Sequence, residues 1–465
     1  MREINDWQHG PTEDAVMKPE LIHYATRNVP RYTSYPTAPH FSDQIDDGTY
    51  SAWLAGLPAD ARTSVYLHVP YCQAMCHYCG CHTKAVRRPE PVADYARTLK
   101  EEILISAVRL GGRRPMVHMH WGGGTPSLLD PADFQDLAAL VYETFDVRPG
   151  AEHAIELDPR TVTKDMVASL AKAGVNRASL GVQDFNPTVQ KAIGRMQSFR
   201  LVADVVEMLQ RAGIGAINMD LMYGLPHQGA KEVEHTVDLT ASLAPARIAL
   251  FGYAHVPWMK THQRLIDAAA LPGALERIEQ AEIAAARLVD HGYVPVGIDH
   301  FARPDDPLAI AARTGTLRRN FQGYTTDPAD ALIGFGASSI GKLPQGYIQN
   351  APDVGGWRRA IEAGKPPIVR GKATGREDIA RAEIIERLMC DFAVDAEAVF
   401  VRHGLPVERL TGAYGALEPL IDDGIAVRDG GRISVPDDMR MFVRLVASAF
   451  DAYLDRGAAR HSVAV

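Results

Sequence analysis

The feature that most constrains the fold of this chain is a sixfold alternation of short apolar runs with longer helical segments. The runs are SVYLHVP (64–70), MVHMHWGGG (116–124), HAIELDP (153–159), RASLGVQ (177–183), AINMDLMYGLP (216–226) and RIALFGYAHVP (247–257). Each ends in glycine, proline or a polar residue, as strands entering loops do. The segments between them, such as 94–112 and 199–213, carry apolar residues at helical spacing. This alternation predicts a parallel sheet covered by helices.

Each of these runs ends in a peptide whose residues could take part in binding or catalysis. A cysteine-rich loop follows the first run, and WGGGTP, ELDP, GVQDFN, DLMYGLP and YAHVP end the others. In (β/α) barrels, chemistry collects at the carboxyl ends of the strands. Periodicity alone does not separate a barrel from an open doubly wound sheet, but six such peptides would converge on one mouth of a barrel. We therefore predict an α/β fold with a partial (β/α)6 TIM-like barrel.

Composition shifts divide the chain into three predicted parts. Residues 1–55 contain VPRYTSYPTAPHF, rich in proline and aromatic residues, and are expected to form an arm laid over the barrel. Residues 56–365 are expected to form the barrel and its extension. Residues 366–465 carry long helical patterns and a hairpin-like GIAVRDGGRISV, which predicts a small, mainly helical C-terminal domain.

Charge and hydropathy exclude several classes of function. The formal net charge is -8 with no long basic run, so we expect no nucleic-acid partner. No apolar run approaches the ~20 residues that cross a bilayer. The first residues, MREINDWQHGPTEDAVMK, lack the apolar segment of a secretory signal, which favours a cytoplasmic protein. In a reducing cytoplasm, thiols are metal ligands or catalytic groups far more often than disulfides.

The cysteine loop YCQAMCHYCGCHT (71–83) holds four of the five cysteines. Cys72, Cys76 and Cys79 follow a C-x3-C-x2-C spacing. Zinc usually takes four ligands in two separated pairs; no second pair is present, although two histidines in the loop leave zinc open. Three thiolates on one loop suit an iron–sulfur cluster with one iron free of protein ligands. Cys81 is then an additional functional thiol or a bystander, and Cys390 reads as a core residue.

An open iron can bind the amino and carboxylate groups of S-adenosylmethionine, and this three-cysteine spacing resembles that of the radical S-adenosylmethionine enzymes. The glycines of WGGGTP would let the backbone approach a ligand closely. Glu156 and Asp220, acidic residues in apolar strands, are candidates for ribose or ammonium recognition, or else caps of following helices. Arg195 suits a carboxylate. His68 is a candidate proton donor, or a core histidine.

Over nearly its whole length the chain resembles the family of oxygen-independent coproporphyrinogen III oxidases, also called coproporphyrinogen dehydrogenases. The resemblance rests on PRYTSYPTA (30–38), HVPYCQAMCHYCGC (68–81), HWGGGTP (120–126), IELDPR (155–160), GVQDFN (181–186), DLMYGLP (220–226), YAHVP (253–257) and RNFQGYTT (319–326). The cysteine motif fits many radical enzymes, whereas RYTSYPT and RNFQGYTT are much narrower.

The resemblance implies a [4Fe–4S] cluster on Cys72, Cys76 and Cys79 and two molecules of S-adenosylmethionine. The residues that match contacts to S-adenosylmethionine are Tyr66, Tyr78, Gly123, Gly124, Thr125, Glu156, Gln183, Arg195, Asp220, Ala254 and Ile340. Tyr78 departs from the phenylalanine common in the family, so its hydroxyl needs a partner if it is buried. Tyr66, His68 and Cys81 are the candidate catalytic residues, and Cys81 matches the family's fourth cysteine.

The implied activity is oxidative decarboxylation of two propionates of coproporphyrinogen III to vinyl groups, which yields protoporphyrinogen IX in haem biosynthesis. A 5′-deoxyadenosyl radical abstracts hydrogen, and a one-electron donor such as a flavodoxin or ferredoxin reduces the cluster. The family also implies a monomer. Candidate residues for the substrate carboxylates are Arg31, Lys84, Arg87, Arg88, Arg318 and Arg319.

The alternative is a haem chaperone of the same superfamily. Such relatives typically have aspartate and phenylalanine after the third cluster cysteine and lack the long N-terminal arm. Here Gly80 and Cys81 follow Cys79, and RYTSYPT is present, so the oxidase is favoured. A radical enzyme that modifies RNA fits poorly with an acidic chain.

Overall fold

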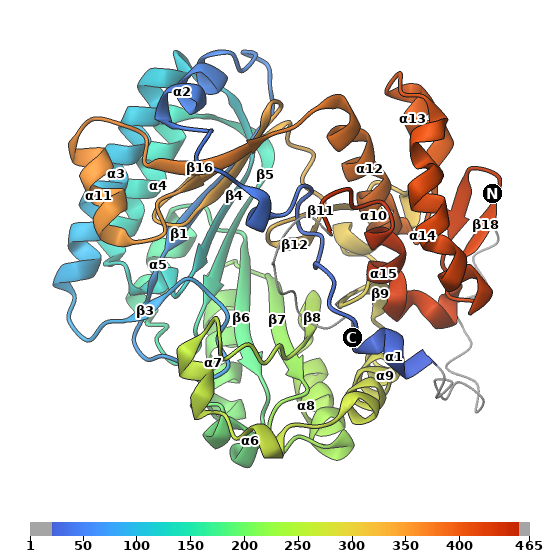
Figure 1. Cartoon of the computed structure of the whole chain (residues 1–465). Coiled ribbons are helices and arrows are strands. Elements are labelled where there is room, and N and C mark those ends of the chain that lie inside the picture. Colours follow the sequence, from blue (N-terminus) through green and yellow to red (C-terminus); the bar gives the residue numbers. More distant parts are fainter. Residues whose placement is uncertain (1–20, 455–465) are drawn as a thin grey trace.

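A curved twelve-stranded sheet forms the centre of the molecule (Figure 1). The computed structural model describes residues 21–454. In spatial order the strands are β16 (Ile368–Ala373), β15 (Gly346–Asn350), β14 (Ile340–Leu343), β13 (Ala331–Phe335), β1 (Thr63–Val69), β4 (Pro115–Gly123), β5 (Asp146–Leu157), β6 (Arg177–Gln183), β7 (Ala216–Tyr223), β8 (Arg247–Gly252), β10 (His300–Ala302) and β9 (Val294–Val296).

The six predicted strands are confirmed as β1, β4, β5, β6, β7 and β8, and each pairs in parallel with the next. On the other side of β1, β13 adds a further parallel strand, which the sequence analysis did not predict. Antiparallel strands extend both flanks. Within the described residues the outermost strands, β16 and β9, do not pair with each other, so the barrel is partial as predicted.

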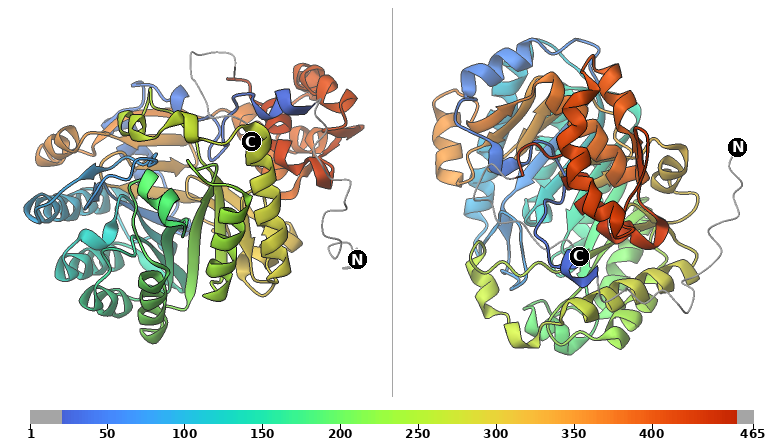
Figure 2. Two further views of the ribbon diagram at one scale, coloured as in Figure 1. Left: turned by 90° about the horizontal axis from the view of Figure 1, so that it is seen from below. Right: turned by 45° about the vertical axis from the view of Figure 1, so that its right-hand side comes forward.

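Helices cover the outer face of the sheet (Figure 2). They include α3 (Glu90–Leu110), α4 (Pro131–Thr144), α5 (Lys164–Lys172), α6 (Pro187–Ala192), α7 (Phe199–Arg211), α8 (Ala230–Ser242), α9 (Ala274–Asp290), α10 (Pro307–Thr314) and α11 (Val354–Glu362). In α7 the buried side chains recur at helical spacing: Val202, Val205, Val206 and Leu209. Ser198 caps this helix, because its side chain accepts a hydrogen bond from the Leu201 amide.

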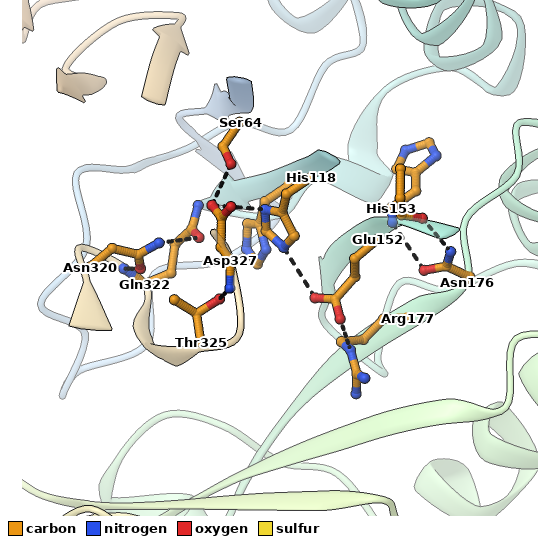
Figure 3. Close-up of polar contacts among 12 residues, drawn as sticks. Ser64, His118, Glu152, His153, Asn176, Arg177, Asn320, Gln322, Thr325 and Asp327 are labelled. Atoms are coloured by element: carbon orange, nitrogen blue, oxygen red, sulfur yellow. Dashed lines mark hydrogen bonds and ion pairs between the residues drawn. The ribbon is translucent and has the colours of Figure 1, made fainter. Parts of the chain in front are cut away.

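The inner face of the barrel is polar (Figure 3). His118 on β4 lies 3.1 Å from Glu152 on β5, and Arg177 on β6 lies 2.8 Å from the other oxygen of Glu152. Burial raises the pKa of Glu152, but the hydrogen bond from His118 and the charge of Arg177 outweigh it and hold that pKa below its usual range. Asp327 accepts a hydrogen bond from Ser64 beside this group. Because strand side chains alternate between faces, apolar residues pack outward against the helices while polar residues line the interior.

A second hydrophobic core lies beside the barrel. It is built by α12 (Arg376–Asp391), β17 (Ala393–Asp395), α13 (Ala396–Arg402), α14 (Thr411–Asp422), β19 (Arg432–Ser434) and α15 (Val443–Ser448), while the exposed β18 (Val427–Asp429) lies beside β19. The predicted hairpin is confirmed by the antiparallel pairing of β18 with β19. Both ends of the chain contribute to this core, since Tyr24 and Tyr32 of the N-terminal arm are buried within it.

The arm crosses from this second core to the edge of the main sheet. Within it, α1 (Ile22–Ala25) and α2 (Asp47–Ala55) are helical. The hydroxyl of Tyr24 donates to Asp423 at 2.6 Å, and Ser42 forms a bridge to Gly371 on β16. Because β16 belongs to the main sheet, the second core begins after it; the three-part division at 55 and 365 stays a prediction.

Among the described residues, no helix combines the length and the apolar character needed to span a bilayer.

Candidate active site

The cysteine loop leaves the carboxyl end of β1 and returns through β3 (Lys84–Ala85), which pairs with β2 (Tyr71–Cys72). Its far side is held by the segment that follows β8. His262 Nε2 donates to the Cys79 carbonyl at 2.7 Å, Gln263 to that of Tyr78 at 2.8 Å and Lys260 to that of Cys81 at 2.9 Å. The sequence analysis missed these contacts, since no local pattern links residues 260–263 to the cysteines.

Each sulfur of the predicted cluster ligands has a hydrogen-bonding neighbour suited to a thiolate. The sulfur of Cys72 contacts Thr83 Oγ1 at 3.2 Å and Thr125 Oγ1 at 3.5 Å. That of Cys76 contacts Arg160 Nη2 at 3.4 Å and Arg195 Nη1 at 3.6 Å. That of Cys79 accepts from the Cys81 amide at 3.4 Å. Hydrogen bonds to the sulfurs are one way in which a protein stabilises and tunes an iron–sulfur cluster. The donor set therefore fits a cluster held by these three thiolates.

Cys81 differs from the other loop cysteines. Its side chain is exposed, and it hydrogen-bonds to Cys79. Hydrogen bonds from the thiol and amide of Cys81 lower the pKa of Cys79 to about 6, whereas the same contact and burial by surrounding protein raise the pKa of Cys81. Cys390 is buried in α12, as predicted for a core residue.

A single-ion site has less support in this loop. In the part of the chain that the structure describes, no group of three histidine, cysteine or acidic side chains is arranged to hold one metal ion. His77, a possible zinc ligand in sequence, instead contacts the Ala192 carbonyl through Nδ1 at 3.1 Å. Its ring packs against Gly194, where a Cβ atom would lie 2.8 Å from Nε2.

The glycine run 122–124 packs against side chains of the protein itself. A Cβ at Gly122 would lie 2.7 Å from Glu156 Oε1, one at Gly123 would lie 2.6 Å from the His68 ring, and one at Gly124 would lie 2.5 Å from the Tyr71 carbonyl oxygen. Gly123 also has φ +113°, which disfavours other residues. The sequence predicted that a ligand would approach these glycines closely. In the structure, atoms of the protein itself already do so.

Tyr66 and His68 form a chain of hydrogen bonds next to the loop. His68 Nε2 donates to the His82 carbonyl at 2.9 Å, so Nδ1 accepts from the Tyr66 hydroxyl at 3.0 Å. Burial lowers the pKa of His68, which favours the neutral ring. This geometry supports the interpretation of His68 as a buried positioning histidine; its role as a proton donor stays a hypothesis.

Glu156 and Asp220 occupy the inner face of the barrel as two unlike carboxyl groups. Burial raises the pKa of Glu156, but the hydrogen bond and charge of His120 and the Gly123 amide hold it below its usual range. Burial and the charge of Glu156 raise the pKa of Asp220 to about 6. Ser179 donates to Asp220 at 3.0 Å. Neither carboxylate caps a helix.

Asp158 and Arg160, which the sequence analysis did not single out, complete the surroundings of Cys76. Asp158 accepts hydrogen bonds from both Arg160 and Arg195. Arg195 also donates to the Gly181 carbonyl at 2.5 Å. Asp158 and Arg160 belong to the IELDPR peptide, but only the fold shows that this peptide contacts the cysteine loop.

The remaining predicted contacts lie around the same mouth. Gln183 ends β6 with φ 69°, and Ile340 begins β14. Ala254 follows β8, where its carbonyl accepts from Gln263. Tyr78 is half-buried against the cluster of apolar side chains around Tyr253, and burial raises the pKa of its hydroxyl although the charge of Arg195 opposes this.

The six basic residues predicted to meet substrate separate into groups. Lys84, Arg87 and Arg88 are exposed beside the cysteine loop. Arg318 pairs with Glu386 at 3.2 Å. Arg31 lies close to Arg319, whose Nη2 donates to the Arg31 carbonyl at 3.2 Å. The fold thus brings only Arg31 and Arg319 together.

Comparisons with known proteins cover nearly the whole chain. The family described as "Radical SAM superfamily" matches residues 66–240, and "HemN C-terminal domain" matches residues 375–442. The oxygen-independent coproporphyrinogen III oxidase of Bradyrhizobium diazoefficiens is 52% identical over 444 residues, which are 96% of this chain and 99% of the relative. That of Paracoccus denitrificans is 43% identical over 439 residues, 94% and 96% of the two chains.

A solved structure shares the fold. The coproporphyrinogen III oxidase of Escherichia coli, described as a radical SAM enzyme, superimposes with a TM-score of 0.87 at 35% identity. The match covers 91% of this chain and 98% of that one.

Proposed function

The chain belongs to the family of oxygen-independent coproporphyrinogen III oxidases, and we propose that the mouth of its barrel carries out that family's reaction. The reaction is the anaerobic oxidative decarboxylation of two propionates of coproporphyrinogen III, which yields protoporphyrinogen IX. The observation that supports this site best is the set of hydrogen bonds to the sulfurs of Cys72, Cys76 and Cys79.

The family uses a [4Fe–4S] cluster and two molecules of S-adenosylmethionine. When bound, they supply the one-electron chemistry that removes a hydrogen atom from a substrate propionate. We assign the cluster to the three cysteines just named. We assign the binding of S-adenosylmethionine to Tyr66, Tyr78, Gly123, Gly124, Thr125, Glu156, Gln183, Arg195, Asp220, Ala254 and Ile340.

The chain's own residues act by charge and position. Glu156 is ionised at neutral pH and already accepts from His120 and the Gly123 amide, so it is a fixed acceptor for hydroxyl or ammonium groups. Asp220, with a pKa of about 6, is a second acceptor nearby. Arg195 is held by Asp158 and placed against Cys76, where its charge favours an anionic group.

Solvent access is limited at the same place. Glu156, Asp220 and Tyr66 are only partly buried, yet burial by surrounding protein is the main cause of the pKa shifts of Asp220 and Tyr66. A reactive intermediate is protected from side reactions in such a setting.

Three further features are part of the proposal. A reduced flavodoxin or ferredoxin supplies the electrons, the enzyme acts as a monomer, and it works in the cytoplasm. The net charge of -8 would repel an acidic electron donor, but the exposed Lys84, Arg87 and Arg88 beside the cysteine loop offer it a local basic surface.

The test is an anaerobic assay of the reconstituted protein with coproporphyrinogen III, S-adenosylmethionine and a reductant. We expect protoporphyrin after oxidation, together with about two 5′-deoxyadenosines per product, one for each propionate. Cys72→Ser should lose the visible absorption of the cluster and both products. If the wild-type protein forms deoxyadenosine and binds haem tightly but makes no protoporphyrin, it is a haem chaperone and the proposal is wrong.

A further inference from the structure

Four arginines from separate parts of the chain gather near the carboxyl ends of β7 and β8. They are Arg31 of the arm, Arg277 of α9, Arg319 of β11 (Arg318–Asn320) and Arg444 of α15. Arg31 Nη2 donates to the Gly252 carbonyl at 3.2 Å, at the last residue of β8. The cluster therefore lies at the same mouth as the cysteine loop, since that loop is held by residues 260–263 from the segment after β8.

Main-chain carbonyls fix these side chains in place. Arg319 Nη2 donates to the Arg31 carbonyl at 3.2 Å, Arg277 Nη1 to the Tyr253 carbonyl at 2.8 Å and Arg444 Nε to the Pro30 carbonyl at 3.1 Å. A carbonyl oxygen orients a guanidinium but does not neutralise its charge. The arginines are thus ordered before any ligand arrives, which reduces the entropy lost on binding.

The positive charges act on one another. Burial, together with the charges of Arg31 and Arg319, lowers the pKa of Arg444 to about 9. Burial and the charge of Arg31 also lower the pKa of Arg277. The carboxylate that faces this group is Asp299, and it accepts a hydrogen bond from His300 at 2.6 Å. Asp451 accepts a hydrogen bond from the Tyr32 hydroxyl of the arm at 3.1 Å.

Neither Arg31 nor Arg319 forms an ion pair with a carboxylate among the described residues, and the side chain of Arg31 is exposed. Burial lowers the pKa of Arg319, but the charges of Tyr324 and Asp299 outweigh it and raise that pKa, so Asp299 compensates Arg319 in part without an ion pair. The guanidinium of Arg319 lies over the Tyr324 ring at 4.4 Å, and its Nε and Nη1 have no hydrogen-bond partner within residues 21–454. Tyr324 is itself fixed by donating to the Met389 carbonyl at 2.7 Å. Fixed positive charge attracts an anion; the two unpartnered nitrogens of Arg319 are buried, so the exposed Arg31 is the member of the pair that a ligand meets first.

We propose that Arg31 and Arg319, backed by Arg277 and Arg444, bind a propionate carboxylate of the substrate and so orient the macrocycle toward the cysteine loop. This inference rests on the proposed function and adds to it the residues that recognise the substrate. Guanidinium groups suit carboxylates because they present several donors in a plane. The site also explains why the N-terminal arm crosses the barrel: it delivers Arg31 to the end of β8.

The test compares Arg31→Gln and Arg319→Gln with Arg318→Gln in the reconstituted holoenzyme. Arg318 is the matched control: it neighbours Arg319, but its pairing with Glu386 removes it from the candidate residues for the substrate carboxylates. We expect each of the first two variants to raise the KM for coproporphyrinogen III about tenfold or more. Cluster absorption and affinity for S-adenosylmethionine should stay within about twofold of wild type, as losing a carboxylate contact predicts. The control should match wild type throughout.

A binding measurement makes the result independent of turnover. Wild-type protein should bind coproporphyrin III, the stable oxidised macrocycle, more tightly than its tetramethyl ester, which lacks carboxylates. Arg31→Gln and Arg319→Gln should reduce this preference, and Arg319→Lys should restore part of it by returning the charge. If Arg319→Gln does not fold, the exposed Arg31→Gln carries the test.

Two failures are distinguishable. Wild-type protein that makes no protoporphyrin overturns the proposed function, and with it this inference. Active wild-type protein whose Arg31→Gln and Arg319→Gln variants keep the wild-type KM and the wild-type preference for free carboxylates overturns the inference alone.

Discussion

Asp158 accepts hydrogen bonds from both terminal nitrogens of Arg195, each at 3.2 Å, and so aims this guanidinium at the sulfur of Cys76. The two side chains are 11% and 7% exposed, which makes this a buried ion pair rather than a surface one. Arg160 joins the same carboxylate from the opposite side. The orientation of Arg195 therefore depends on Asp158, which lies far from the cysteine loop in the sequence.

Asp158→Asn should destabilise the protein strongly. The substitution leaves two buried guanidinium groups without their carboxylate, which costs about 3 kcal/mol of unfolding free energy. Asp330→Asn is the control, because Asp330 pairs with Arg62 at the same kind of geometry but with both side chains almost half exposed. The control should lose less than about 1 kcal/mol. Urea unfolding of both variants measures the difference; equal losses would contradict the prediction.

Gly123→Ala should disturb both the fold and the site. A Cβ atom would lie 2.6 Å from the His68 ring, and φ +113° is unfavourable for alanine. We expect the unfolding free energy to fall by about 2–4 kcal/mol and the iron content after reconstitution to fall with it. Gly215→Ala, where no atom lies within 4 Å of the new Cβ, should behave like wild type. Normal stability of Gly123→Ala would show that β4 shifts without cost.

Asp220→Asn should change how stability depends on pH. The pKa of Asp220 in the fold is raised to about 6, so its proton stabilises the fold fully below about pH 4, and that stabilisation is lost as the pH rises through about 6. In the absence of S-adenosylmethionine, the variant should melt a few degrees above wild type at pH 8. Its advantage should shrink toward pH 5. A constant difference between pH 5 and 8 would argue against this origin.

The same substitution should weaken the site. The Asp220 carboxylate is a proposed acceptor for S-adenosylmethionine, so its loss should lower the affinity for that molecule about tenfold. Equilibrium binding at pH 8 measures this directly. Unchanged affinity would remove Asp220 from the proposed binding residues.

Cys81→Ser tests the fourth thiol of the loop. Cys81 is exposed and hydrogen-bonds to Cys79, so it lies beside the proposed cluster without being one of its three ligands. We expect iron and sulfide content equal to wild type but protoporphyrin formation reduced about 100-fold, as for a lost proton or hydrogen donor. Full activity with an intact cluster would make Cys81 a bystander.

Much of the fold could be predicted because its signals are local. The six parallel strands appear as apolar runs that end in turn residues, and the spacing of the cysteines is contained in one short peptide. Strand β13 was missed because its five residues are few and carry no alternation of their own. Its place beside β1 depends on closure of the sheet.

The site could be predicted only where one peptide carries the whole signal. Glu156, Asp220 and Arg195 were found as charged residues at strand ends. Their partners His120 and Asp158 were missed, because a hydrogen bond between neighbouring strands depends on register and leaves no mark in either strand alone. The sequence predicted that a ligand would lie against the glycines after β4, but side chains such as His68 already fill that space.

The contact between Arg444 and Pro30 joins positions 414 residues apart in the sequence. Every residue proposed for the cluster and its hydrogen bonds, by contrast, lies before residue 264. During synthesis the ribosome therefore releases the complete cysteine loop and its supports long before the residue that anchors the arm. The arm can take its final path, and Arg31 its final position, only when synthesis has passed residue 444. The part of the site that selects the substrate is the last to be assembled.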